Sequence, residues 1–525
     1  MTKTVDTARS APPRLGSSIT NRDSPPLWWA VIQLTALSFH LPLTVLTGNQ
    51  SAIASRESVL LIGGAVTIIS MTLYLLLGFS VMPKWRALAL VSVTIIYFWH
   101  WSGSVGGGLL SGPIPAIAIY VLVAAAAVKF AQRHFFKVAA FAISVALAGT
   151  LGLLAIVDTL KAPAASVGVQ NPVEAAQFTQ TPDIVLIVLD GYGRADVIDS
   201  VYGHDNGPFL DGLVDEGFDV AQESIANYSI THLSIPALLN MSYMHPDGAV
   251  IGNNDLHYLA DQISGGNDLV EMLKANGYSY VHAESDHWYN ACGDNVDICL
   301  PGPKPDITGH ALLVRTPIGG LFYRDTGDPT TALNRTRVDQ LTHWDETTSE
   351  WPDGPVFAFF HVQLPHPPLY MDSECEVRVD PELGGRIMNN GEMSPEQLER
   401  RKEAWVEQVE CANATIESFV DQLDDDTVVV LVSDHGPDLN FMLESNPADL
   451  DPEGLAERFP SLTAVRLPDE CRGNLPDDVD TVNTFRVLTN CLTGQTAETL
   501  PTRNFIAGFG GPIVELKLDR QNAED

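Results

Sequence analysis

Residues 183–190 read Asp-Ile-Val-Leu-Ile-Val-Leu-Asp, an apolar run with no polar residue between its two terminal aspartates. A strand with one face in water alternates apolar and polar side chains, so an unbroken run predicts a strand buried on both faces. Two later runs, 356–360 and 428–432, have the same character. Such strands are typical of parallel sheets that helices cover on both sides.

Helical patterns separate these strands, at 208–216, 268–276 and 396–423. Strands that alternate with helices predict an α/β domain with a mostly parallel sheet, which we place over residues 183–525. In such sheets the ligand site lies beyond the carboxyl ends of the strands. We therefore expect the functional residues to follow the strands directly.

Acidic and imidazole side chains stand at those positions. A mixed set of carboxylates and imidazoles suits zinc or manganese better than magnesium or calcium, which prefer oxygen ligands alone. The residues that follow the three predicted strands are two aspartates and three histidines: Asp190, Asp434, His435, His361 and His366.

Each of these residues has an ordinary alternative role. An aspartate after a strand often caps a helix, and Asp-His-Gly at 434–436 is compatible with a plain turn. His366 stands between prolines, where it is equally suited to packing against a rigid loop. The joint occurrence of the motifs in this order favours a metal site over the separate alternatives.

A nucleophile is expected between the first and second strands, in the segment 227–240. This segment reads as a turn that leads into a helix from about Leu233. Thr231 then stands at the helix N-terminus, where free N–H groups and the helix dipole favour an anion. Coordination to a metal activates an otherwise poor hydroxyl nucleophile. The alternative is that Thr231 or Ser234 is only a helix cap.

The first third of the chain is almost continuously apolar. Five stretches in it are long enough, or nearly so, to cross a bilayer of roughly 30 Å, and the third is the shortest. Buried helices of a soluble protein are the alternative, but five in succession with short loops favour membrane spans. The stretches are 27–47, 58–81, 87–101, 114–130 and 136–157.

Basic residues lie before the first stretch, between the second and third, and between the fourth and fifth. The positive-inside rule then predicts a cytoplasmic tail over residues 1–26 and a transmembrane region over 27–160. Five crossings place the rest of the chain outside the cytoplasmic membrane. Residues 161–182, without a clear period, read as a linker to the domain over 183–525.

All six cysteines lie in the predicted exterior domain. An even number confined to one region favours disulfides in an oxidising compartment, which agrees with the exterior placement. Proximity in sequence suggests that neighbouring cysteines pair, which is one of the fifteen pairings that six cysteines allow, and free buried thiols are the alternative. The neighbouring pairs are Cys292–Cys299, Cys375–Cys411 and Cys471–Cys491.

The formal net charge is −35, and almost all of it lies after residue 183. An acidic exterior repels phosphates, which argues against nucleic acid as a partner. A solvated acidic surface explains the charge most simply. A salty habitat or a cationic partner is the alternative.

The motifs together resemble the sulfatase-like branch of the alkaline phosphatase superfamily. Residues 186–191 resemble its first metal motif, the segment from Thr231 to Asn240 resembles its nucleophile segment, and residues 433–436 resemble its Asp-His-Gly motif. The segments that resemble membrane-bound bacterial members are 360–367 and 482–486.

This resemblance, over roughly residues 180–512, implies an alkaline-phosphatase-like fold. The architecture is similar to that of lipoteichoic acid synthases and phosphoethanolamine transferases, which place several membrane helices before an exterior catalytic domain. It implies that Asp190, Thr231, Asp434 and His435 form one metal site. His366 is then expected to hold a second metal or the substrate.

The chain also departs from the family pattern. Sulfatases carry Cys or Ser in a C/S-x-P-x-R motif, which is converted to formylglycine. The nearest match, Ser234-Ile-Pro-Ala-Leu238, lacks the arginine and is offset from Thr231. Asn240 replaces the start of the usual Gly-containing turn. The missing arginine and the offset disfavour sulfate ester hydrolysis, whereas Asn240 leaves the exact alignment of this segment open.

The leading hypothesis is two-step phosphoester chemistry, in which Thr231 attacks and a hydroxyl acceptor or water displaces the resulting phospho-threonine. We assign general acid catalysis to His366 and substrate binding to Arg194 and His361. A membrane anchor suggests an envelope lipid or glycan substrate. The alternatives are a hydrolase of sulfate or simple phosphate esters on the same fold, and an inactive envelope scaffold or receptor. The sequence leaves the oligomeric state open.

Overall fold

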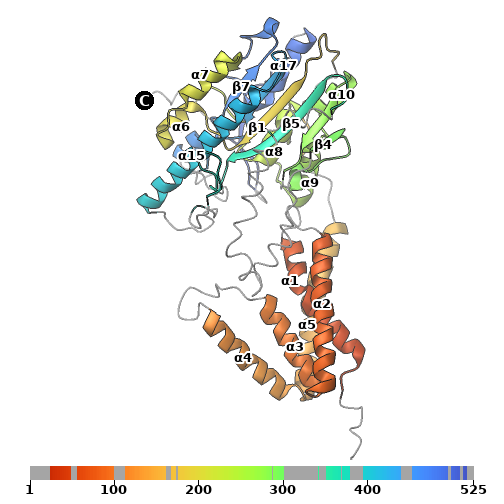
Figure 1. Cartoon of the computed structure of the whole chain (residues 1–525). Coiled ribbons are helices and arrows are strands. Elements are labelled where there is room, and N and C mark those ends of the chain that lie inside the picture. Colours follow the sequence, from red (N-terminus) through yellow and green to blue (C-terminus); the bar gives the residue numbers. More distant parts are fainter. Residues whose placement is uncertain are drawn as a thin grey trace, which may run out of the picture. The chain divides into compact units, whose positions relative to one another are not determined.

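The computed structural model divides the chain into two compact units, an amino-terminal helical unit and a carboxy-terminal α/β unit, which are described separately (Figure 1). The described residues are 24–48, 56–99, 113–160, 167–172, 176–285, 288–300, 341, 351–367, 369–378, 383, 394–438, 452–494, 498–508 and 512–516.

Long apolar helices make up the helical unit. Ala30 and Leu34 of its first helix are buried against residues of the next two helices. Gln33 donates a hydrogen bond to Ser92 Oγ (2.9 Å), which satisfies two buried polar groups between the first and third helices. Many large apolar side chains elsewhere in the unit are exposed. The helices are α1 (Leu27–Gly48), α2 (Arg56–Ser80), α3 (Lys84–Trp99), α4 (Pro113–Phe130) and α5 (His134–Leu160).

Two segments in this unit are long and apolar enough to cross a membrane, judged by length and composition: Leu27–Thr44 in α1 and Leu60–Ser80 in α2. The other three predicted spans fall on α3, α4 and α5, and α3 has only 16 residues. The five-span arrangement therefore stays a prediction. Residues 1–23 of the predicted tail, and 161–166 and 173–175 of the predicted linker, lie outside the described residues.

A seven-stranded sheet in the order β2-β7-β6-β1-β5-β3-β4 forms the centre of the α/β unit (Figure 1). β1 pairs in parallel with β5 and β6, and β3 pairs in parallel with β5 and β4. β7 runs antiparallel to both its neighbours, so the sheet is mixed but mostly parallel. The strands are β1 (Ile184–Asp190), β2 (Phe218–Val220), β3 (Ser279–Ala283), β4 (Ile298–Leu300), β5 (Val356–Pro365), β6 (Val428–Ser433) and β7 (Thr463–Arg466); β8 (Asn504–Ile506) and β9 (Val514–Leu516) form a separate pair.

Alternate residues of β1 face two separate cores, which explains the unbroken apolar run. Val185 and Ile187 pack with α6, α7 and α15 on one face of the sheet. Leu186 and Val188 pack with α8, α10 and α17 on the other. The helices are α6 (Ala195–Tyr202), α7 (Gly207–Asp215), α8 (Thr231–Asn240), α9 (Asn253–Ile263), α10 (Asp268–Ala275), α15 (Pro395–Val420), α16 (Pro452–Arg458) and α17 (Thr481–Thr493), with short 3₁₀ turns η2 (Trp288–Asn290) and η4 (Asp469–Cys471).

The structure shifts some predicted boundaries around the expected site. Asp190 is the last residue of β1, and β5 continues to Pro365, so that His361 lies within a strand. β5 is longer than predicted because it keeps pairing with the end of β1. The helix of the nucleophile segment begins at Thr231, since the preceding Ile230 is extended and its carbonyl accepts the first helical N–H groups.

All six cysteines are paired, and the predicted pairing of sequence neighbours is confirmed. One disulfide joins Cys375 to Cys411 in α15 across 36 positions, and another joins Cys292 to Cys299 across only 7. A longer closed loop restricts the unfolded chain more, so the Cys375–Cys411 bond is expected to stabilise the fold more strongly.

Replacement of both Cys375 and Cys411 by Ala is expected to lower the free energy of unfolding by about 4 kcal/mol, from the loss of loop-closure entropy. The matched control, Ala at both Cys292 and Cys299, is expected to cost about 2.5 kcal/mol. Denaturant unfolding of the full chain in detergent without reductant measures both. An equal or larger loss in the control would contradict the loop-length argument.

Candidate metal and catalytic site

The carboxyl ends of β1 and β6 bring together a buried group of ligand atoms. Asp190 closes β1, while Asp434 and His435 follow β6 directly. One ligand atom from each residue lies within 4.8 Å of the others. Nε2 of His435 is 3.2 Å from Asp434 Oδ2 and 3.9 Å from Asp190 Oδ1. The two strands are direct neighbours in the sheet, which explains why residues so distant in sequence converge.

Hydrogen bonds of ordinary length join the ends of β1 and β6. The backbone N–H groups of Gly191 and His435 both donate to Asp434 Oδ1, at 3.0 and 2.9 Å. Ser433 Oγ accepts from the N–H of Tyr192 and donates to His435 O. Gly191 has a φ of +73°, a left-handed conformation that glycine adopts without strain. The orientation of the Asp434 carboxylate is therefore fixed by backbone groups.

The glycine of Asp-His-Gly is required by close packing. A Cβ on Gly436 would collide with the carbonyl oxygens of Glu457, Arg458 and Pro460. The N–H of Gly436 donates to Arg458 O at 2.7 Å. The turn after β6 is thus held against the end of α16.

Thr231 reaches the same group from the start of α8. Its Oγ1 lies 3.2 Å from His435 Nε2. The loop before it is anchored by Asn227, which donates to Arg503 O and accepts from Val482 N. Thr231 is therefore presented at a helix N-terminus, directly beside the carboxylates and imidazole that the motifs predicted.

Ser234, the alternative residue in this segment, faces elsewhere. It is fully buried, and its hydroxyl donates to the backbone oxygen of Asp434. Its proton is therefore engaged in holding α8 against the turn after β6. Of the two hydroxyls, only that of Thr231 contacts the His435 imidazole among the described residues.

The two histidines of the β5 segment occupy different environments. His361 is buried, with Nε2 3.4 Å from Asp190 Oδ2. His366 is partly exposed, and its backbone N–H donates to the backbone oxygen of Asp190 at 3.0 Å. Nδ1 of His366 lies 2.6 Å from the carbonyl oxygen of Pro367. His361 is thus placed to orient Asp190, whereas His366 is the more exposed of the two histidines.

Arg194 is not brought to this group. Its Nε and one terminal nitrogen donate to the two oxygens of Asp196, each at 2.7 Å. The other terminal nitrogen donates to Ser224 O at 3.1 Å. The guanidinium is therefore engaged with an exposed carboxylate, and its predicted role in substrate binding stays a prediction.

Sequence reasoning missed Arg458, the last residue of α16. Its side chain is fully buried, and one terminal nitrogen lies 3.0 Å from His435 Nε2. The available signal was a charged residue just before the apolar run that contains β7. That signal is weak, because most arginines at the end of a helix lie on the surface.

Electrostatic interactions shift the pKa values of the two carboxylates in opposite directions. Burial acts to raise the pKa of Asp190, but the neighbouring imidazoles, foremost that of His366, outweigh it and hold this pKa well below its ordinary value. Burial and the negative charge of Asp190 raise the pKa of Asp434 well above its ordinary value. Two like charges this close disfavour joint ionisation, so the pair titrates as a unit.

Burial lowers the pKa of His435 well below its ordinary value, and the positive charge of Arg458 adds to this effect. The imidazole is therefore neutral at physiological pH. Its Nδ1 lies 3.0 Å from Gly436 O, which can only accept, so Nδ1 carries the proton. Nε2 then carries the ring's lone pair, which accepts a hydrogen bond from a terminal nitrogen of Arg458 at 3.0 Å.

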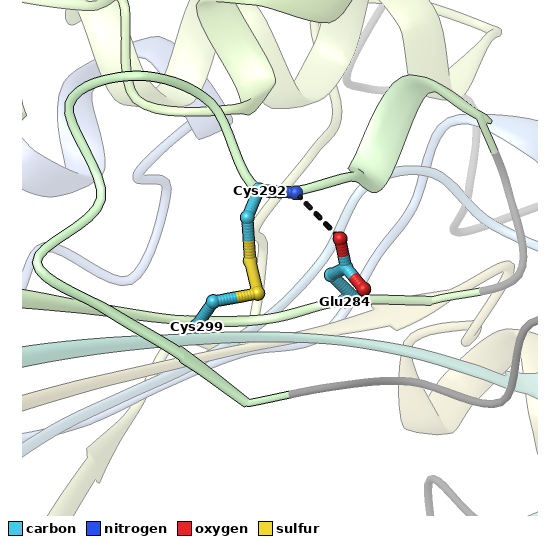
Figure 2. A group of neighbouring side chains, drawn as sticks. All are labelled: Glu284, Cys292 and Cys299. Atoms are coloured by element: carbon cyan, nitrogen blue, oxygen red, sulfur yellow. Dashed lines mark hydrogen bonds between the residues drawn. A yellow bond between two sulfur atoms is a disulfide. The ribbon is translucent and has the colours of Figure 1, made fainter.

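A second group of possible ligands, Glu284 with Cys292 and Cys299, is of another kind. Figure 2 shows that the two sulfur atoms are bonded to each other, while the Cys292 N–H donates to Glu284 Oε1 at 3.2 Å. Metals are held by free thiolates, which a disulfide does not supply. The Cys292–Cys299 disulfide instead closes a short loop beside β3 and β4.

A family model described as Sulfatase matches residues 182–458, more than half of the chain. The chain belongs to the sulfatase family. The matched segment contains Asp190, Thr231, Asp434 and His435. Its activity is therefore that of a sulfatase-like hydrolase or phosphotransferase.

Among solved structures, similar chains include the C-terminal periplasmic domain of EcEptC from Escherichia coli (12% identity, 66% of this chain and 96% of that chain, TM-score 0.39). Lipooligosaccharide phosphoethanolamine transferase A from Neisseria meningitidis, an integral membrane protein, has 13% identity over 90% and 96% of the two chains (TM-score 0.37). A protein of the alkaline phosphatase superfamily from Vibrio parahaemolyticus has 14% identity over 67% and 85% (TM-score 0.39). Because these TM-scores are below 0.5, the family assignment rests on the sequence match. No curated protein matches the chain.

Sulfatase-family proteins are metal-dependent, and the buried residues of this site fit a divalent cation. Asp190 Oδ1 and Asp434 Oδ2 are buried and receive no hydrogen bond from the described part of the chain. Buried carboxylate oxygens without donors are costly, and a cation relieves that cost. Two carboxylates with a neutral imidazole suit zinc or manganese.

Zinc binding is expected to release a proton at pH values below the raised pKa of Asp434, because the cation requires the ionised carboxylate. Affinity then increases as pH rises through that pKa, whereas His435, already neutral, contributes no proton. Titration calorimetry in buffers of different ionisation enthalpy measures the proton count. Asp434→Asn is expected to remove this pH dependence; a wild-type proton count that does not change with pH would refute the assignment.

Proposed function

We propose that this sulfatase-family protein is a membrane-anchored, metal-dependent enzyme that cleaves or transfers phosphoester groups of an envelope lipid or glycan, with Thr231 as nucleophile. One observation carries the proposal: the Thr231 hydroxyl lies 3.2 Å from His435 Nε2, at the N-terminus of α8 and beside two buried carboxylates. The competing hydroxyl, that of Ser234, donates to a backbone carbonyl instead.

In the proposed first step, Thr231 Oγ1 gives up its proton to solvent and forms a bond to phosphorus, while the bond from phosphorus to the leaving oxygen breaks. The leaving oxygen takes the electron pair and receives a proton from the His366 imidazole. The N–H groups and dipole of the first turn of α8 stabilise the negative phosphoryl oxygens. In the second step a hydroxyl acceptor or water gives its proton to the His366 imidazole and attacks phosphorus. The bond from phosphorus to Thr231 Oγ1 breaks, and Oγ1 keeps the electron pair and takes a proton from solvent.

Asp190, Asp434 and His435, with Thr231, are the residues that would hold the cation. When bound, a divalent cation lowers the pKa of a hydroxyl nucleophile and offsets phosphoryl charge. His361 would act on this set indirectly, since it contacts the second oxygen of Asp190. That contact favours an orienting role over the substrate binding predicted for it.

The membrane part of the proposal rests on the amino-terminal helices. α1 and α2 contain segments suited by length and composition to span a bilayer. Three disulfides in the α/β unit fit an oxidising compartment. We propose that the helical unit anchors the chain in the cytoplasmic membrane, with the catalytic domain outside, where an envelope lipid or glycan is accessible.

A second candidate, hydrolysis of sulfate or simple phosphate esters, is favoured by the family match itself. Against the sulfate ester, Ser234 lacks the arginine of the formylglycine motif, and its hydroxyl faces Asp434 O. Phosphoester chemistry through Thr231 therefore suits the residues present better.

Thr231→Ala is expected to lower phosphodiester cleavage by at least roughly 10³-fold, because the attacking oxygen is lost. Thr231→Ser keeps the hydroxyl and is expected to retain measurable activity. Ser234→Ala, the matched control in the same helix, is expected to stay within roughly tenfold of wild type. The assay follows release of a chromogenic alcohol from paired phosphodiester, phosphomonoester and sulfate esters by the full chain in detergent.

Full activity in Thr231→Ala would exclude Thr231 as the nucleophile. Preferred turnover of the sulfate ester, lost in Ser234→Ala and kept in Thr231→Ala, would instead support the second candidate.

A further inference from the structure

Arg458 is a buried cation whose donors are all engaged. Its Nε and one terminal nitrogen both donate to Ser229 O, at 2.9 and 2.8 Å. The same terminal nitrogen donates to His435 Nε2 at 3.0 Å. The other terminal nitrogen donates to the carbonyl oxygens of Gly436 (3.0 Å) and Pro437 (3.4 Å). These five contacts account for all five N–H groups of a guanidinium.

The acceptors belong to two segments that carry the site. Ser229 lies two residues before Thr231, in the loop that enters α8. Gly436 and Pro437 form the turn directly after His435. Thr231 and His435 are separated by 204 positions, so no local chain geometry sets the distance between them. The rigid fork of one guanidinium spans both segments, which a lysine ammonium does not reproduce.

These contacts argue against a role in binding the substrate directly. A guanidinium that binds a phosphate or sulfate group presents N–H groups to it. Here four of the five N–H groups donate to the backbone carbonyls of Ser229, Gly436 and Pro437, which a bound cation would leave in place. Only the fifth donates to His435 Nε2, whose lone pair a cation would take. Ser229, in turn, is fixed from its other side, because its N–H donates to Phe505 O and its Oγ accepts from Ala507 N.

We propose that Arg458 is a positioning residue that fixes the Thr231 loop and the Asp-His-Gly turn relative to each other, so that the metal-binding atoms are assembled before the cation arrives. This inference rests on the proposed function, since it assumes that these residues hold a divalent cation. Residues that orient metal ligands without touching the metal typically contribute about 10–100-fold to affinity.

The direction of the change in metal affinity distinguishes a positioning role of Arg458 from an effect of its positive charge. A fixed positive charge beside the site repels a cation, so its removal would by Coulomb's law strengthen metal binding. Loss of positioning acts in the opposite direction. Arg458→Met removes both the charge and the fork, whereas Arg458→Lys keeps the charge and loses the fork. Positioning therefore predicts weaker binding in both variants.

Arg466 in β7 offers a matched control. It is also buried, and it also donates to backbone carbonyls, those of Thr427 (3.2 Å) and Asp424 (3.0 Å). Those carbonyls precede β6, whereas Asp434 and His435 follow it. Arg466→Lys and Arg466→Met therefore disturb a similar buried arginine at the opposite edge of the sheet.

The experiment measures zinc affinity of the full chain in detergent, by competition with a chromophoric chelator, together with thermal unfolding of each zinc-free variant. We expect zinc binding to weaken roughly 10–100-fold in Arg458→Met and Arg458→Lys, and to stay within roughly threefold of wild type in both Arg466 variants. Arg458→Lys alone decides the question if Arg458→Met does not fold.

Unchanged or tighter zinc binding in Arg458→Lys would overturn the inference while wild-type zinc binding leaves the proposed metal site intact. Equal weakening in the Arg466 variants would also overturn it, because the effect would then follow general stability. A wild-type protein that binds no zinc or manganese would instead refute the proposed function, and the inference with it.

Discussion

Two neighbouring parallel strands place buried carboxylates at their carboxyl ends, and the other residues of the site surround this pair. β1 and β6 carry Asp190 and Asp434 to the same edge of the sheet, where both side chains are buried. Burial of two like charges is strongly unfavourable unless hydrogen bonds, imidazoles or a cation compensate for it. The hydrogen-bond donors and positively charged groups around the pair lower the free-energy cost of burying these two carboxylates.

This stabilisation differs between the two carboxylates, so their pKa values shift in opposite directions. Imidazoles keep the pKa of Asp190 low, whereas burial and Asp190 itself raise the pKa of Asp434. Each aspartate still has one buried oxygen without a donor among the described residues. These two oxygens are the ones that we propose bind a divalent cation.

The proposed nucleophile, Thr231, comes from a different part of the chain. α8 begins at Thr231 because Ile230 is extended, and the loop before it is fixed to the β8 segment through Asn227 and Ser229. Arg458 connects that loop to the turn after β6. The geometry of the proposed site thus depends on buried polar contacts with backbone carbonyls, which set positions more rigidly than apolar packing alone.

The sequence by itself determined the α/β class, the three buried strands and the candidates Asp190, Thr231, Asp434 and His435, because these features follow from short apolar runs and from residues adjacent to them. Only the tertiary structure decided that Ser234 faces a carbonyl, that Arg194 pairs with Asp196, and that Arg458 lies inside. Those outcomes depend on the directions of side chains from segments up to about 230 positions apart, as between Ser229 and Arg458. Local periodicity contains no information about such directions, since they are fixed only when the strands and helices pack together.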